Sequence, residues 1–269
     1  MCLILLAWHA HPEYPLVFAG NRDERYERPS SAADFWKDEP EIFGGRDLEL
    51  GGTWLGLRRN GRFAAITNYR DGRAKKPAPR SRGEPTANFL RGQDGPAAYM
   101  NRVATADGCL YGGYTLLAGD RERLYGLSNR GGGLEELPPG VHGLSNHLLN
   151  TPWPKIVRGK RRVEALLGAS ESELQAGLFE ALADRNPATE AELPETGVGS
   201  ARERGVSPAF IAADHYGTRA STVLLIDRDG AVVFAERRFG PRGAALGETE
   251  KRFALAAEAA GGWQLAAGG

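Results

Sequence analysis

Residues 2–8 (CLILLAW) and 16–24 (LVFAGNRDE) decide how the fold begins. The first stretch is a continuous apolar run, which predicts a strand buried on both faces. The second stretch also begins with apolar residues, and the intervening residues 11–15 (HPEYP) are typical of a turn. We therefore predict an antiparallel hairpin. Counting outward from its turn places the partner of Cys2 near residues 21–24.

Cys2 directly follows the initiator methionine. Methionine is normally trimmed when the next side chain is small, and trimming would leave a thiol and a free α-amine on one residue. The thiol is a nucleophile for a carbonyl carbon, and the amine, with a reference pKa of about 7.7–8.0, accepts its proton. The alternative is that a small second residue occurs here by chance, as in many proteins. The polar residues predicted beside this terminus favour the catalytic interpretation.

Composition narrows the class of protein. The chain has 269 residues, with 34 basic and 34 acidic side chains and a formal net charge of zero. This balance argues against a dedicated nucleic-acid binder. The two cysteines, Cys2 and Cys109, have no paired spacing, which indicates a reducing cytoplasm rather than a disulfide scaffold. The sequence contains no apolar run near the ~20 residues of a membrane-spanning helix, and residues 2–8 are too short for a signal peptide.

Strands outnumber helices in the predicted element order, and they occur as hairpins. The predicted hairpins after the first pair residues 53–58 with 62–68, 114–119 with 123–129, and 221–227 with 231–239. Apolar periodicity predicts helices over residues 87–104, 154–167 and 171–183. Two segments, 70–83 and 186–205, have the Pro, Gly and charge content of mobile loops. We predict one α+β domain over residues 1–269, with mainly antiparallel sheets and outer helices.

Several short motifs, in order and at characteristic spacing, resemble the NRDE family, also called the transport and Golgi organisation 2 family. They include the N-terminal Met-Cys, 21–24 (NRDE), 51–56 (GGTWLG), 67–68 (TN), 80–83 (RSRG), 143–146 (GLSN), 151–155 (TPWPK) and 216–222 (YGTRAST). The resemblance covers nearly the whole chain. It implies a branch of the N-terminal-nucleophile (Ntn) hydrolases, whose αββα sandwich stacks two mainly antiparallel sheets between helical layers.

The resemblance also implies an active site and a mechanism. The catalytic residues carried over by motif are Cys2, Arg22, Asp23, Asn68, Asn146 and Arg219. Cys2 matches the nucleophile that cleaves linear amides in cysteine Ntn enzymes, and Asn146 matches the donor to the oxyanion. The reaction would be acyl transfer to the thiol followed by hydrolysis of the thioester, with no cofactor required.

Each of these residues also has a structural interpretation. Arg22 beside the thiol would stabilise the thiolate. The alternative is an ordinary ion pair of Arg22 and Asp23 at a hairpin end, but their position opposite Cys2 favours the site. A buried Asp23 would orient the α-ammonium group and raise its pKa. Asn146 is typical of a turn, and Asn68 of a strand end. Arg219 fits a surface charge beside a turn.

The competing function is non-enzymatic handling of haem or of an acyl lipid such as acyl-CoA in the same pocket. The resemblance implies it, because eukaryotic members of the family are associated with these cargoes. Haem binding requires an axial ligand, and the candidates are Cys2, His9, His11, His142, His147 and His215. Spacing joins no third ligand to His9 and His11, so we predict no metal site. The predicted partners are therefore a small-molecule amide, haem or an acyl lipid.

Overall fold

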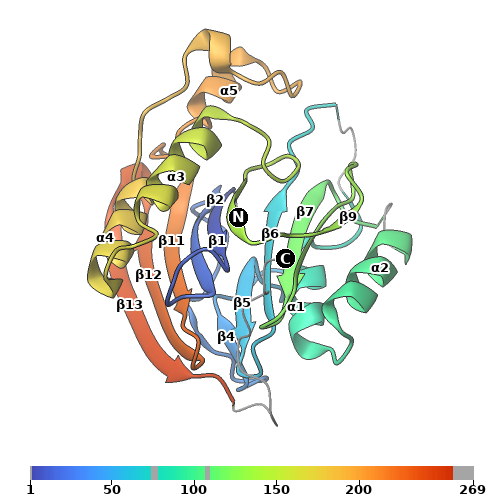
Figure 1. Cartoon of the computed structure of the whole chain (residues 1–269). Coiled ribbons are helices and arrows are strands. Elements are labelled where there is room, and N and C mark those ends of the chain that lie inside the picture. Colours follow the sequence, from blue (N-terminus) through green and yellow to red (C-terminus); the bar gives the residue numbers. More distant parts are fainter. Residues whose placement is uncertain (1, 74–77, 107–109, 257–269) are drawn as a thin grey trace.

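The computed structural model describes residues 2–73, 78–106 and 110–256. Two antiparallel β-sheets lie face to face, and helices cover the outer face of each sheet (Figure 1). The layers therefore follow the order helix, sheet, sheet, helix, which confirms the predicted αββα arrangement.

The first sheet contains the hairpin predicted from residues 2–24. Its strands, in order across the sheet, are β10 (Gly140–Leu144), β1 (Leu3–Trp8), β2 (Leu16–Arg25), β11 (Tyr216–Ile226), β12 (Ala231–Phe239) and β13 (Ala245–Ala254). Leu3 pairs with Asn21 and Trp8 pairs with Leu16. This register brings Cys2 to the end of β2, as the count from the turn predicted.

The second sheet contains two more of the predicted hairpins. Its strands, in order, are β3 (Asp34–Phe35), β4 (Ile42–Gly44), β5 (Leu55–Arg58), β6 (Phe63–Asn68), β7 (Tyr114–Gly119), β8 (Leu124–Ser128) and β9 (Leu134–Glu136).

Gly61 has a φ of +89° in the turn between β5 and β6, and Gly230 has a φ of +84° between β11 and β12. Glycine adopts this conformation without the steric cost that a side chain would bring, which is why both turns form where predicted.

The helices form the two outer layers (Figure 1). They are α1 (Gly83–Arg91), α2 (Pro96–Ala106), α3 (Pro154–Ala165), α4 (Glu171–Leu182) and α5 (Ser200–Gly205), with 3₁₀ turns η1 (Glu190–Glu192) and η2 (Pro241–Gly243). The prediction of one helix over residues 87–104 was wrong. The segment forms α1 and α2, because the helix ends at Gly92 and Pro96 starts a new one. The segment 186–205, predicted as a loop, contains η1 and α5.

The core explains the continuous apolar run of β1. Ile4, Leu6 and Trp8 join the apolar layer between the two sheets. Leu3 and Leu5 join a second apolar layer under α3 and α4. Alternate residues of a strand point to opposite faces, so a strand covered on both sides needs apolar residues throughout. A third layer packs α1 and α2 on the second sheet.

Along the described ranges, the structure has no helix with the length and apolar character needed to cross a membrane. Cys109 lies outside the described residues.

Candidate functional site

Several strand ends meet at one end of the sandwich. Cys2 precedes β1, Asp23 lies near the end of β2, and Tyr216 begins β11. Asn146 follows the end of β10, and Asn68 ends β6 of the other sheet. Antiparallel pairing brings the start of one strand beside the end of its neighbour, so residues distant in sequence gather here.

Cys2 is buried, with 4% of its surface exposed, and it lines a cavity of about 730 Å³. Its backbone N–H donates to the carbonyl oxygen of Asn21 at 2.9 Å. Its own carbonyl oxygen accepts from the Ser145 hydroxyl at 2.5 Å. The Sγ atom lies 3.6 Å from the carbonyl oxygen of Asp23 and 3.7 Å from the Tyr216 hydroxyl. The thiol is thus held at the cavity wall by contacts from β2 and β11.

Asn146 joins the two sheets beside this cavity. Its φ of +53° is left-handed, a conformation that asparagine tolerates better than most residues. Its side-chain amide donates to the carbonyl oxygen of Asn68 at 3.1 Å. Arg70 donates to its Oδ1 atom at 3.2 Å and pairs with Glu203 at 2.5 Å. Asn146 is therefore both the predicted turn residue and a positioned amide that lines the same cavity as Cys2 and Asn68.

Asp23 is a buried carboxylate with one unused oxygen. The Thr218 hydroxyl donates to Oδ1 at 2.7 Å. Its Oδ2 atom has no hydrogen-bond partner among the described residues. Burial raises the pKa of Asp23, and the positive charges of Lys155 and of the chain terminus oppose that rise. An α-ammonium group at Cys2 would therefore meet an acceptor that other residues leave free.

Lys155 is a second buried charge near the terminus. Its ammonium group donates to the backbone carbonyls of Val206 at 3.0 Å and Pro208 at 3.5 Å. Burial lowers its pKa to about 8, while the charges of Asp23 and Cys2 partly oppose this. Helix α3 carries Lys155 into the site because its first turn packs against the first sheet, where Ile156 is also buried.

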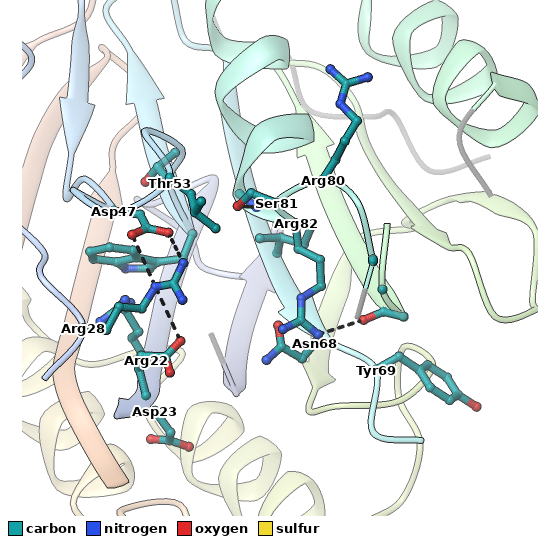
Figure 2. A pocket seen from close by; sticks show the side chains of 18 of the residues that line it. Arg22, Asp23, Arg28, Asp47, Thr53, Asn68, Tyr69, Arg80, Ser81 and Arg82 are labelled. Atoms are coloured by element: carbon teal, nitrogen blue, oxygen red, sulfur yellow. Dashed lines mark hydrogen bonds and ion pairs between the residues drawn. The ribbon is translucent and has the colours of Figure 1, made fainter. Parts of the chain in front are cut away.

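A second cavity of about 400 Å³ adjoins the first (Figure 2). Asn68, Tyr69, Asp71 and Arg82 line both cavities, whereas Arg22 and Asp23 line only the second. Burial lowers the pKa of the Arg22 guanidinium and likewise that of Arg82. The site thus consists of two adjoining hollows, with the thiol in one and Arg22 in the other.

Arg219 is not brought together with the other predicted site residues. It lies at a bulge of β11. Its guanidinium donates to the backbone carbonyls of Arg25, at 3.3 Å, and Arg28. It is not among the residues that line either cavity. Its observed contacts hold the loop after β2, so a catalytic role for Arg219 stays a prediction without geometric support.

Three residues of the site were not predicted as catalytic from the sequence: Tyr216, Lys155 and Arg82. All three lie in motifs that carried the family resemblance. That membership was the available signal, but each role depends on which chain segment lies opposite. The position of Tyr216 in the site depends on the register of β11 on β2, and the position of Lys155 depends on the packing of α3.

The candidate haem ligands do not converge. Among the described residues, no group of three or more His, Cys, Asp or Glu side chains is placed to hold a metal ion. The His147 ring contacts the Tyr69 hydroxyl at 2.8 Å and the Thr151 hydroxyl at 2.9 Å. The His142 ring likewise has a partner on each nitrogen, while His215 is exposed.

The fold has a counterpart among solved structures. The chain aligns with the mutant C2A conjugated bile acid hydrolase from Clostridium perfringens, with a TM-score of 0.50, 10% identity, and coverage of 95% of this chain and 92% of that chain. The two chains therefore share a fold of the Ntn-hydrolase type, which defines the structural class.

Sequence comparison gives the family within this class. The Transport and Golgi organisation 2 profile matches residues 1–241. The homologue from Bos taurus is 39% identical over 261 residues, covering 88% of this chain and 92% of the relative. The human homologue is 36% identical over 260 residues, with the same coverage. The chain belongs to the Transport and Golgi organisation 2 family, which confirms the resemblance seen in its motifs.

Proposed function

We propose that the chain hydrolyses a linear amide by acyl transfer to Cys2, after Met1 has been removed. One observation carries the proposal. The Cys2 thiol and the Asn146 amide line one cavity, beside a buried carboxylate of Asp23 that has an unused oxygen. A nucleophile, an oxyanion donor and an acceptor for the terminal amine are the groups this reaction requires.

In the first step, Cys2 Sγ attacks the amide carbonyl carbon. The thiol proton passes to the α-amine, which Asp23 orients, and from there to the leaving nitrogen. The C–N bond breaks as the C–S bond remains, which leaves a thioester. The second N–H of Asn146 donates to the oxyanion. Water, deprotonated by the α-amine, then attacks the thioester and releases a carboxylic acid and the thiol.

The test combines intact mass with acyl-transfer assays. We expect loss of Met1, and release of nitroaniline from a panel of acyl p-nitroanilides. Cys2→Ala should abolish this release. Inserting one alanine before Cys2 should also abolish turnover, because it moves the free amine away from the thiol, yet the thiol should still react with iodoacetamide. Met1 retained in the purified protein, or turnover unchanged by Cys2→Ala, would contradict the mechanism.

Carriage of haem or an acyl lipid is the competing function. It predicts a shift of the haem Soret band on titration, insensitive to Cys2→Ala and lost on removal of one histidine. The hydrogen bonds on both ring nitrogens of His142 and of His147 argue against either as the axial ligand.

A further inference from the structure

Arg22 is an arginine that the fold buries without a partner. It is 95% buried, since its exposed fraction is 5%. Its guanidinium stacks on the Trp54 ring, 4.2 Å from the centroid. Among the described residues, no carboxylate lies within ion-pair distance of it and no hydrogen bond satisfies its N–H groups. Buried charges are normally paired. An unpaired buried arginine therefore lacks a negatively charged partner, which a ligand would supply.

Arg82, on the other side of the hollow, also has no ion-pair partner among the described residues. Its one hydrogen bond among the described residues is a long one, 3.5 Å to the carbonyl oxygen of Gly113. In Figure 2, Arg22 and Arg82 lie on opposite sides of the cavity, and Arg80 points away from it. Arg82 also lines the cavity of Cys2, and negative charge on the Cys2 thiol favours its charged form.

Two other arginines that line this hollow have carboxylate partners, and a third, Arg130, is exposed. Arg28 pairs with Asp47 at 2.6 Å, and Arg80 pairs with Glu84. In the described part of the chain, Arg22 and Arg82 therefore differ from these arginines, because they have no carboxylate partner and are not exposed. A guanidinium that lies over an aromatic ring still has its N–H edge available for a planar or tetrahedral anion.

We infer that Arg22 and Arg82 form a subsite for a compact anionic group, a carboxylate or a phosphate, carried by the substrate of Cys2. This inference rests on the proposed function, because it assigns a substrate group to the same site. The shared cavity wall at Arg82 places the anion in the hollow next to the thiol, so the substrate is an amide with an acidic group near the scissile bond.

The test compares two alkylating reagents that differ in charge. Iodoacetate carries a carboxylate and iodoacetamide is neutral, and both alkylate a thiolate by the same displacement of iodide. We expect the iodoacetate-to-iodoacetamide rate ratio at Cys2, resolved by peptide mass spectrometry, to exceed that of free glutathione at least tenfold. Arg82→Gln should lower the ratio at least fivefold. Arg22→Gln provides a second variant, with thermal unfolding as the check that it folds.

Arg25→Gln is the matched control. It removes the same charge from the wall of the Cys2 cavity, but this side chain is 59% exposed and pairs with Glu24. The control should change the ratio less than twofold. A ratio equal to that of glutathione, or an equal fall in Arg82→Gln and Arg25→Gln, would overturn the subsite.

Competition by small anions shows whether the subsite binds a carboxylate or a phosphate. Inorganic phosphate and acetate, at matched ionic strength, are tested for slowing the alkylation of Cys2 by iodoacetamide. Protection by phosphate assigns a phosphate group, and protection by acetate assigns a carboxylate. Protection by neither overturns the inference. Because alkylation needs no turnover, the outcome is separate from amide hydrolysis: a protein inert to nitroanilides but selective for iodoacetate loses only the proposed reaction.

Discussion

The Tyr216 hydroxyl lies 3.7 Å from the Sγ atom of Cys2, across a separation of 214 residues. Negative charge on Cys2 is the largest cause that raises the pKa of Tyr216, followed by burial and Asp23. The phenol therefore stays protonated at neutral pH and is available to donate to a thiolate. Tyr216 is thus a half-buried donor at the nucleophile, supplied by strand β11.

Tyr216→Phe should slow alkylation of Cys2 by iodoacetamide about tenfold at pH 7, because a hydrogen bond to an ionised group is worth about 1.5–3 kcal/mol. Peptide mass spectrometry gives the rate at Cys2. Tyr125→Phe serves as the control, since that hydroxyl bonds Glu136 in the other sheet. Equal rates in wild type and Tyr216→Phe would show that the phenol does not stabilise the thiolate.

Asn146→Gly should separate acyl transfer from simple thiol reactivity. Glycine keeps the left-handed conformation at this position and removes only the side chain. Acylation of Cys2 by p-nitrophenyl acetate should fall about 100-fold, the usual cost of losing one oxyanion donor. Alkylation passes through no oxyanion, so its rate should stay within roughly twofold. Equal losses of rate in both reactions would mean that Asn146 maintains the shape of the cavity and does not stabilise the oxyanion.

Sequence predicted the part of the site that local register determines. Cys2 and Asp23 belong to one hairpin, and counting residues outward from its turn predicts that they lie close together. The favoured turn residues Gly61 and Gly230 likewise defined two hairpins. These features depend on residues close in sequence, where turn chemistry and strand period leave few alternatives.

The sequence patterns that predict other elements were weaker or conflicting. Strand β13 is an exposed edge strand, so its sequence lacks the alternation of a half-buried strand. The break between α1 and α2 had a signal in Gly92 and Pro96, but apolar residues on both sides continued the helical pattern. Lys155 and Arg82 were not among the predicted catalytic residues, because tertiary packing of α3 and of the loop before α1 places them.

Lys155 should make stability depend on pH in the alkaline range. Its folded pKa of about 8 is below the ordinary lysine value of 10.5, so the unfolded chain binds more protons between these two values. Unfolding free energy should therefore rise with pH across this window, by up to about 3 kcal/mol. Urea denaturation at pH 7 to 10.5 measures this rise. Lys155→Met should remove it, whereas Lys160→Met, on the exposed side of α3, should retain it. The same slope in Lys155→Met and wild type would contradict the assignment.

The close approach of Gly52 to Gly83 connects stability with the proposed anion subsite. A Cβ atom at Gly52 would lie 2.6 Å from the carbonyl carbon of Gly83, and the Thr53 N–H donates to the Gly83 carbonyl oxygen at 3.2 Å. Both contacts are with backbone, which has little freedom to move aside. This contact joins the GGTW and RSRG motifs in space, since each supplies one of the two glycines.

Gly52→Ala should therefore push Gly83 away and displace its neighbour Arg82. We expect a loss of about 1–3 kcal/mol in unfolding free energy, the usual cost of overpacking, together with a lower iodoacetate-to-iodoacetamide ratio at Cys2. Urea denaturation and the alkylation assay measure the two effects on the same protein. Gly95→Ala is the control, because a Cβ there meets nothing within 4 Å. A destabilised Gly52→Ala that keeps the wild-type ratio would show that Arg82 reaches the cavity without support from this contact.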